Sequence, residues 1–216
     1  MSFFISLEGI EGSGKTTQIK RLADRLESLG HAVLITREPG GCPIADQIRQ
    51  ILLHPDNGHL DPKAELLLYA AARAQHVAEV IRPALDQGKI VLCDRYCDAT
   101  LAYQGYARGL DLPMVKQLNE LAAGNCRPHL TLLLDMPHDR GLLRARSRNA
   151  LGAGPEEGRF EQESLAFHNK VRQGYLDLAR QEPQRIKVVD ANGTLDEVCH
   201  RIWLTTSNAL NLPGGM

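Results

Sequence analysis

Short apolar runs alternate with amphipathic segments along the whole chain. Helical patterns separate the runs, including one at 63–86, one from about 138 to 147 and one that begins near 161. The apolar runs are the candidate strands and lie at 3–7, 32–36, 90–93, 130–134 and 186–189. Strands that are apolar on both faces are typical of a parallel sheet covered by helices on both sides. The pattern therefore predicts an α/β fold with three layers and a five-stranded parallel sheet.

Composition narrows the class of protein. With 216 residues, of which 43% are hydrophobic, the chain can bury one good core, and we expect a single domain over 1–216. The net charge of −1 provides no basic field for a nucleic-acid polymer. Apolar runs stay well short of a membrane span, and the first strand starts too early for a signal peptide. Five cysteines without a C-x-x-C pair indicate reduced thiols and a cytoplasmic location.

The first strand is followed by a glycine-rich motif. Its sequence fits G-x-x-x-x-G-K-[ST], and the flanking strand and helix are the context that this motif requires. Its glycines let backbone N–H groups surround phosphate oxygens at the positive end of a helix. The alternative is an ordinary glycine turn, which the Lys-Thr pair disfavours. The candidate phosphate-binding residues are Gly9, Gly12, Ser13, Gly14, Lys15, Thr16 and Thr17.

Polar residues also follow the other strands, where ligands of parallel sheets bind. Within the motif, the Thr16 hydroxyl is a candidate Mg²⁺ ligand. Its partner would be a carboxylate at a strand end, and both Asp94 and Asp135 qualify. We favour Asp94 because Arg95 follows it and offers a cation for a second phosphate group. Asp135 has an alternative interpretation as the N-cap of the next helix.

One segment, about 144–160, breaks the alternation of strand and helix. Glycines and arginines crowd this stretch and its approach, and the arginines are Arg140, Arg144, Arg146, Arg148 and Arg159. Glycine suggests mobility and arginine suggests phosphate binding, so we interpret the segment as a lid over a triphosphate. A solvated loop with charged helix ends is the alternative.

Several motifs occur in an order that points to one family. They are Glu8-Gly9 before the glycine loop, Arg37-Glu38-Pro39-Gly40-Gly41, Arg73, Asp94-Arg95-Tyr96, Ala102-Tyr103-Gln104-Gly105 and Arg159-Phe160-Glu161. Together they resemble the bacterial thymidylate kinase family, which phosphorylates dTMP with ATP. The resemblance covers nearly the whole chain and implies a P-loop kinase fold with a mobile lid. One departure is Ala99, where the family usually has serine; Thr100 is the next hydroxyl along the chain.

The resemblance also implies roles on the dTMP side. Arg37 and Arg95 would hold the dTMP phosphate, and guanidinium forks suit that task. Tyr69 would stack on thymine, and Arg73, one helical turn later, would bond a base carbonyl. The remaining substrate candidates are Thr100 and Gln104 near the base edge, Tyr103 near the sugar, and Glu11 near the sugar and the transferring phosphate. Core packing is the alternative for Tyr69, and loop hydrogen bonds are the alternative for Thr100, Tyr103 and Gln104.

On the ATP side, we expect in-line transfer that depends on Mg²⁺, with Arg144 and Asn192 beside the nucleotide. No variable position of the glycine loop is basic, so the lid is expected to supply a catalytic arginine, first Arg148 and then Arg144. The expected catalytic residues are Lys15, Arg148, Arg144, Arg95, Asp94 and Glu11. The resemblance further implies a homodimer, for which the helix at 63–86 is the candidate face.

Three other functions fit less well. A GTPase needs N-K-x-D, whereas Asn169-Lys170-Val171-Arg172 ends in the wrong charge. A deoxynucleoside kinase would place an acidic base where this chain has Arg37 and Arg95. A nucleotide switch without catalysis would not need that second set of arginines.

Overall fold

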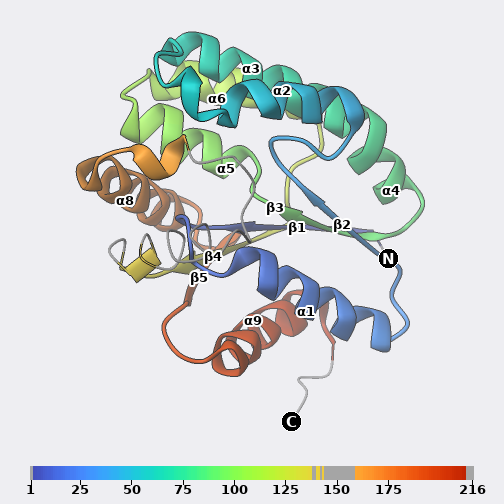
Figure 1. Cartoon of the computed structure of the whole chain (residues 1–216). Helices are drawn as coiled ribbons and strands as arrows, with labels where there is room; N and C mark the ends of the chain where they lie inside the picture. The colour runs from blue at the N-terminus through green and yellow to red at the C-terminus, as the bar shows by residue number, and fades with distance from the viewer. Residues whose placement is uncertain (1, 138–139, 142, 144–158, 213–216) are drawn as a thin grey trace.

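The computed structural model describes residues 2–137, 140, 141, 143 and 159–212. Figure 1 shows a central sheet between two layers of helices. Its strands all run parallel, in the order β2-β3-β1-β4-β5. The strands are β1 (Phe3–Glu8), β2 (Val33–Arg37), β3 (Ile90–Asp94), β4 (Leu130–Asp135) and β5 (Ile186–Asp190). All five predicted strands are confirmed. Each ends on an ionisable residue, so the sheet brings five ionisable side chains to one edge.

Helices cover both faces of the sheet, as predicted (Figure 1). α1 (Lys15–Ser28) and α9 (Leu195–Leu210) pack together on one face. The helices of the other face are α2 (Pro43–Leu53), α3 (Pro62–His76), α4 (Arg82–Asp86), α5 (Cys97–Thr100), α6 (Leu112–Ala123) and α8 (Leu165–Gln181). Two short π-helical segments, η2 (Val77–Ile81) and η3 (Leu101–Ala107), connect α3 to α4 and extend α5. The short 3₁₀ turns are η1 (Pro55–Asn57) and η4 (Phe160–Gln162).

Local capping sets the helix boundaries. The Asp61 carboxylate accepts a hydrogen bond from the backbone N–H of Lys63 (2.8 Å), and Pro62 occupies the first helical position, where its missing N–H costs nothing. The helix predicted over 63–86 therefore starts at this cap, and η2 interrupts its α-helical geometry. The helix predicted from about 161 begins later, at Leu165, because the Ser164 hydroxyl caps it.

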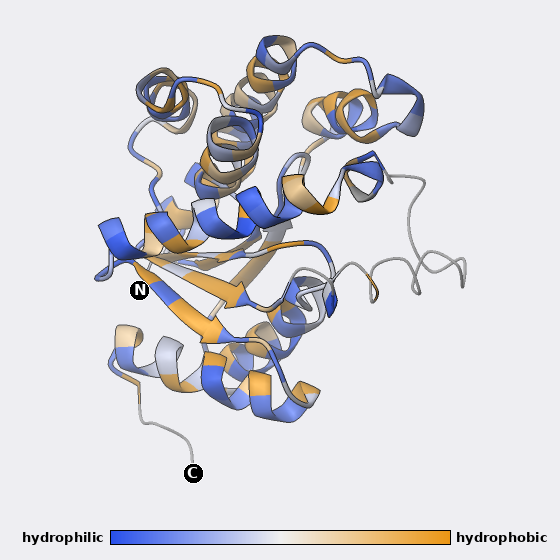
Figure 2. Cartoon of the chain, turned by 90° about the vertical axis from the view of Figure 1, so that its left-hand side faces the viewer, coloured by the Kyte–Doolittle hydropathy of each residue, from blue (hydrophilic) through white to orange (hydrophobic). Residues whose placement is uncertain are grey.

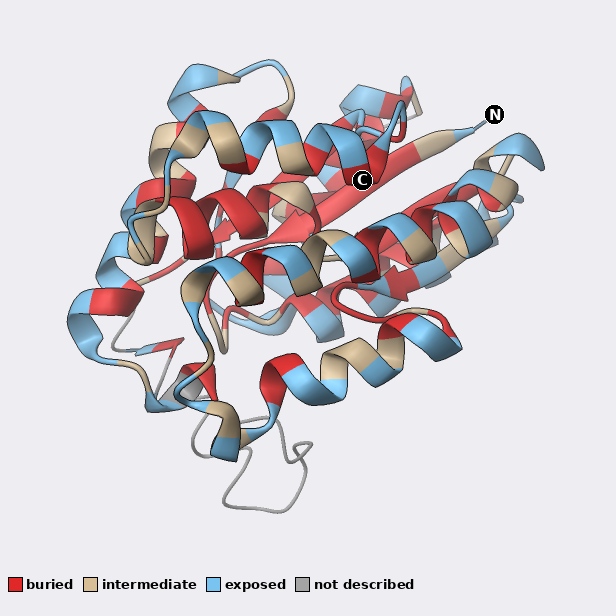
Figure 3. Ribbon diagram, turned by 90° about the horizontal axis from the view of Figure 1, so that it is seen from above, coloured by how far each residue is buried: buried red, intermediate tan, exposed pale blue. Residues whose placement is uncertain are grey.

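The central strands and the inward helix faces form the core. In Figure 2 the strands are the most hydrophobic part of the chain. The central strands β1, β3 and β4 are largely buried, as Figure 3 shows in red. Ser6 and Thr131 are buried polar exceptions, and their hydroxyls satisfy each other at 2.8 Å across β1 and β4. On the other side of β4, Trp203 of α9 is buried, and the Arg25 guanidinium lies 4.0 Å from its ring. This packing fixes the positions of the carboxyl ends of the strands.

Of the predicted lid, only Arg159 and residue 160 lie within the described residues. Arg144, Arg146 and Arg148 lie outside them, as does most of the helix predicted over 138–147.

Candidate active site

The loop between β1 and α1 contains the glycine motif. Gly9, Gly12 and Gly14 have φ values of 136°, 72° and 92°, which L side chains rarely adopt. At Gly9 a Cβ would also lie 2.5 Å from the carbonyl oxygen of Leu134, so only glycine fits beside β4. Gly14 directly precedes the first turn of α1, whose N–H groups have no partner within the helix. The loop and the helix dipole together are suited to bind phosphate.

Lys15 occupies the interior of this loop. Its ammonium Nζ donates to the carbonyl oxygens of Gly9 (3.1 Å) and Ile10 (2.9 Å) and to the Ser13 hydroxyl (3.3 Å). Burial, together with the positive charge of Arg95, lowers the Lys15 pKa to about 8. The side chain is therefore still mainly a cation at pH 7, and its charge lies where phosphate oxygens would enter. Thr17 follows on the exposed side of α1.

Thr16 and Asp94 meet beside the loop. The Thr16 hydroxyl donates to Oδ2 of Asp94 at 2.9 Å, because β3 is the direct neighbour of β1 and ends at Asp94. A hydroxyl and a carboxylate are oxygen ligands that suit Mg²⁺, which takes few protein ligands and keeps several waters. Within the described residues there is no group of three or more His, Cys, Asp or Glu arranged for a metal. This pair therefore fits a Mg²⁺ ion that is bound chiefly by phosphate and water.

Asp135 has a different partner. Its two carboxylate oxygens accept from Nε (2.7 Å) and Nη2 (2.9 Å) of Arg172 on α8. This fork occupies the carboxylate, whereas that of Asp94 faces the glycine loop. Of the two candidates, Asp94 is the one whose position suits the metal, and Asp135 connects β4 to α8.

A second cluster lies on the other side of the glycine loop. Arg95 donates through Nη1 to the Gly9 carbonyl (3.0 Å) and through Nη2 to Oε1 of Glu11 (2.9 Å). The same Glu11 oxygen accepts from the Tyr103 hydroxyl at 2.6 Å. Burial alone would raise the Glu11 pKa, but the Arg95 charge and the hydrogen bonds around it hold that pKa well below its ordinary value. Glu11 is thus ionised and holds Arg95 and Tyr103 together.

Arg37 lies at the end of β2 and next to Asp94 in the sheet register. Its side chain is about half exposed, and Nη2 donates to Oδ1 of Asp46 at 3.1 Å. A salt bridge with this much solvent access is weak. The guanidinium can therefore exchange Asp46 for an incoming phosphate at small cost.

Arg73 is fully buried and has three protein partners. Its guanidinium donates to the Glu38 carboxylate (2.8 Å), the Asn119 side-chain carbonyl (2.6 Å) and the Thr100 hydroxyl (3.0 Å). Glu38 also contacts Nδ1 of His76 at 3.0 Å. A guanidinium has five N–H groups, and these three hydrogen bonds use three of them. The structure thus brings Arg73 and Thr100 together, in an orientation that Glu38 and Asn119 impose.

Tyr69 and Gln104 lie near one buried carboxylate, that of Glu65. Tyr69 is half-buried against the core, and burial followed by the Glu65 charge raises its pKa. Gln104 donates its side-chain amide to Glu65 at 2.7 Å. Arg159, from the end of the predicted lid, is buried and forms an ion pair with the same carboxylate, so its guanidinium is already engaged.

Asn192 lies beyond β5, and its side chain donates to Asp190 at 2.7 Å and accepts from Nη1 of Arg140 at 3.4 Å. Arg140 belongs to the approach of the predicted lid. The contact therefore places Asn192 beside the start of that segment. Arg144 and Arg148, the lid arginines of greatest interest, lie outside the described residues.

Sequence reasoning missed several residues of the site, namely Glu38, Glu65, His76, Asn119, His168 and Tyr175. One signal was present, because Glu65, Tyr69 and Arg73 are spaced by four and share one face of α3. A glutamate on the face that holds the proposed ligand residues indicates an inward role. Glu38 stands in the motif that follows the second strand, and His76 lies three residues after Arg73 on the same helix, so both had a local signal. Asn119, His168 and Tyr175 reach the site from distant segments, and no local pattern announces them.

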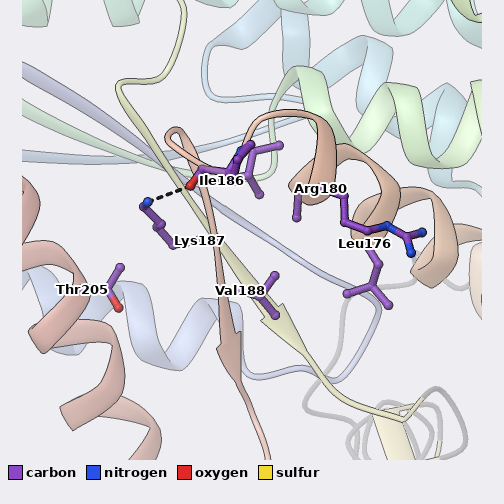
Figure 4. A pocket seen from close by; sticks show the side chains of 8 residues that line it. Leu176, Arg180, Ile186, Lys187, Val188 and Thr205 are labelled. Atoms are coloured by element: carbon purple, nitrogen blue, oxygen red, sulfur yellow. Dashed lines mark hydrogen bonds between the residues drawn. The ribbon is translucent and has the colours of Figure 1, made fainter.

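A surface hollow lies elsewhere, along the edge strand β5 between α8 and α9 (Figure 4). Leu176 and Arg180 of α8 and Val188 of β5 line it, with Thr205 of α9 on the other side. Lys187 donates to the backbone carbonyl of Pro183 at 2.7 Å. None of the described residues lining this hollow is acidic, and none belongs to the motifs above. The candidate functional residues therefore lie at the carboxyl ends of the strands, away from this hollow. No described helix is both long and apolar enough to cross a membrane.

These features define a P-loop nucleotide-binding protein. A strand, glycine loop and helix hold a lysine for phosphate, and a hydroxyl–carboxylate pair suits a metal beside it. The Arg95–Glu11–Tyr103 cluster, on the opposite side of the same loop, adds a place for a second anionic group.

Comparison with known proteins identifies the family. The thymidylate kinase family model matches residues 7–202, and the chain belongs to that family. It is 60% identical over 193 residues to a thymidylate kinase of Citrifermentans bemidjiense, covering 89% of this chain and 86% of that protein. It is 60% identical over 210 residues to a thymidylate kinase of Trichlorobacter lovleyi, covering 97% and 99%. The crystal structure of thymidylate kinase from Ehrlichia chaffeensis has a TM-score of 0.74 at 34% identity, covering 98% of this chain and 99% of that one.

Proposed function

We propose that this chain transfers the γ-phosphoryl group of ATP to dTMP, forming dTDP for dTTP synthesis. Membership of the thymidylate kinase family supports this activity. The single observation that carries it in the structure is the position of Arg95. Its guanidinium contacts both the Gly9 carbonyl and Glu11, so a phosphate held by Arg95 lies directly beside the loop that holds ATP.

On the donor side, the glycine loop, Lys15 and Thr17 bind the ATP phosphates, and Thr16 and Asp94 hold Mg²⁺. When bound, Mg²⁺ neutralises charge on the phosphate oxygens. Lys15 leaves its contacts with the Gly9 and Ile10 carbonyls and turns its charge to the phosphates. Asn192 and Arg144 bind the rest of the nucleotide.

On the acceptor side, Arg37 and Arg95 hold the dTMP phosphate, and Glu11 with Tyr103 faces the sugar. Tyr69 stacks on thymine while Arg73, Thr100 and Gln104 bind its polar edge. A phosphate monoester is largely ionised at pH 7, so the acceptor oxygen needs no strong general base. Catalysis is then mostly positioning and charge neutralisation.

The lid supplies the remaining positive charge that stabilises the transferring phosphoryl group. Arg148 is the leading candidate for this role, with Arg144 next. We expect Arg148→Ala to lower kcat by at least about a hundredfold, because an arginine finger contributes about 10³–10⁵ in rate. The dTMP KM should change little, since Arg37, Arg73 and Arg95 hold the acceptor. Alanine at 144, 146 and 148 in turn, each leaving kcat within a few-fold of wild type, would exclude this assignment.

The test of the function is ADP release, measured in a coupled assay with ATP, Mg²⁺ and each nucleoside monophosphate. We expect dTMP to be preferred over dUMP by a modest factor, because one methyl group is worth about 1–3 kcal/mol. dCMP should be rejected more strongly, because its amino group would face the N–H groups of Arg73. Equal kcat/KM for dCMP and dTMP would contradict the placement of Arg73.

We also propose that the chain is cytoplasmic and forms a homodimer. All five cysteines are free thiols, which suits a reducing compartment. Large apolar side chains are exposed on three neighbouring helices of one face, namely Ile44 and Ile51 on α2, Leu67 on α3 and Leu121 on α6. Leu67 lies within the helix 63–86 that the sequence indicates as the dimer face.

A further inference from the structure

One face of α8 presents a row of polar side chains to the edge where the strands end. His168, Arg172 and Tyr175 are spaced by four and three residues, so they share this face. Each approaches a different carboxylate. Arg172 binds Asp135 through two hydrogen bonds, and the Tyr175 hydroxyl donates to Oε2 of Glu8 at 2.8 Å.

His168 is the third member of the row, and its contact is incomplete. The residue is fully buried, and its Nδ1 lies 3.4 Å from Oε2 of Glu11. Within the described part of the chain, neither ring nitrogen of His168 has a hydrogen-bond partner, and neither does that Glu11 oxygen. The other oxygen of Glu11 accepts from both Arg95 and Tyr103. Buried polar groups rarely stay unpaired, because each costs about 1–3 kcal/mol.

The surrounding packing keeps this pair together. α8 lies directly on η3, where a Cβ added at Gly174 would be 2.8 Å from the Cβ of Tyr106. The same π-helical segment carries Tyr103, which donates to Glu11. Phe167 meets the His168 ring edge to face, with centroids 5.7 Å apart. A movement of about half an ångström would bring Nδ1 and the Glu11 oxygen to normal hydrogen-bond length.

We propose that His168 is a positioning residue for the phosphoryl transfer, acting through Glu11. Its Nδ1–H donates to Oε2 of Glu11 and fixes the carboxylate on which Arg95 and Tyr103 are aligned. This inference rests on the proposed function, because its effect on turnover requires Arg95 to hold the acceptor phosphate. His168 itself contacts Glu11 and not the reacting atoms.

The experiment compares two replacements of His168. Phenylalanine keeps the ring volume without a donor, whereas asparagine keeps a side-chain N–H near the position of Nδ1. We expect His168→Phe to lower kcat/KM for dTMP by about 5- to 150-fold, which corresponds to about 1–3 kcal/mol for an unpaired buried group, with the ATP KM unchanged. His168→Asn should restore most of that loss. An Asn variant no better than the Phe variant would overturn the proposal, because asparagine keeps a donor at this position and phenylalanine does not.

A double-mutant cycle identifies Glu11 as the intermediary. In the Glu11→Ala background, where no side-chain acceptor remains for His168, His168→Phe should have little further effect on kcat/KM for dTMP. Effects that multiply in the double variant would mean that His168 does not act through Glu11.

A measurement on the unmodified protein removes any dependence on variant folding. The ¹⁵N shifts of the His168 ring report which nitrogen carries the proton. A proton on Nδ1 supports the proposal, and a neutral ring protonated only on Nε2 overturns it. Wild-type protein that releases no ADP with dTMP would refute the proposed function instead, while the ring shifts would still test the hydrogen bond.

Discussion

Arg95 shows how much one residue position can depend on the surrounding structure. It has a φ of 69°, which a non-glycine side chain adopts only at a cost of about 1–3 kcal/mol. Arg95 directly follows β3, and this backbone conformation turns its guanidinium back over the first strand. There the guanidinium reaches the Gly9 carbonyl. Backbone strain of this kind persists where the contacts that it permits hold it in place.

Replacing Lys15 tests the phosphate loop. Lys15→Ala should lower kcat to less than about a tenth of wild type, because loop contacts with phosphate matter by orders of magnitude. Lys15 packs among loop carbonyls, so the protein should stay folded by circular dichroism. Lys20→Ala, an exposed lysine on the same helix, is the control and should retain full turnover. A variant at Lys15 with near-normal kcat would refute the role.

The raised pKa of Glu8 predicts that the stability of the folded protein depends on pH. Burial, reinforced by the charge of Asp98, raises its pKa from 4.5 to about 8. Between these values the unfolded chain has lost the proton and the folded chain has kept it, so the free energy of unfolding falls as pH rises. The slope from this group is about 1.4 kcal/mol per pH unit between pH 4.5 and 8.

Glu8→Gln removes that titration. The variant should gain stability relative to wild type as the pH is raised from 5 to 8, as measured by urea unfolding at each pH. Glu27→Gln, at an exposed position of α1, should follow the wild-type curve. An unchanged difference between Glu8→Gln and wild type across this range would show that Glu8 is ionised in the folded protein.

At the scale of elements, buried carboxylates connect helices that are distant in sequence. Glu65 on α3 binds Gln104 of η3, Arg108 just after it, and Arg159 beyond β4. Glu38, after β2, binds both Arg73 and His76 of α3. These contacts orient α3, which carries the proposed base-binding residues, relative to the strand ends.

Breaking the Glu65 cluster should loosen these elements. Glu65→Gln leaves the buried Arg159 guanidinium without its counter-charge, and losing one member of a buried ion pair costs about 3–5 kcal/mol. Thermal unfolding should report a clear loss of stability, with the dTMP KM raised more than the ATP KM. Glu120→Gln, an exposed glutamate on α6, is the matched control. Equal stability of the two variants would mean that the cluster contributes nothing to the fold.

At the scale of the whole molecule, the two helical layers present different surfaces. The layer formed by α2, α3 and α6 exposes several large apolar side chains, with Leu121 81% exposed. On the other face, Leu195 (53%) and Leu204 (41%) of α9 and Leu29 (48%) after α1 are also exposed, but they do not extend over three neighbouring helices. Exposed apolar side chains gathered on one face are typical of protein–protein contacts.

The proposed dimer is tested by light scattering after size exclusion. Wild type should have twice the chain mass, and Leu121→Asp should shift the population toward the monomer because it places a charge in the interface. Leu204→Asp carries the same charge on the opposite layer and should remain a dimer. A monomeric wild type, or a Leu121→Asp variant that dimerises normally, would contradict the assigned face.

The sequence alone determined the strands and the glycine loop, because both are written in local patterns. A run such as Leu130–Leu134 is apolar on both faces, and Gly9–Thr16 carries its glycines, lysine and threonine at fixed spacing. The order of motifs along the chain was also sufficient to indicate the family. These features need no knowledge of which segments lie side by side.

Only the tertiary structure decided which charged groups meet. Asp94 and Asp135 look alike in sequence, but the pairing of β3 with β1 places Asp94 beside Thr16, while α8 brings Arg172 to Asp135. The partners of Glu11 show the same dependence, since His168 is separated from it by more than 150 residues. Such contacts arise from the packing of whole elements, and a buried charge has no local signature that names its partner.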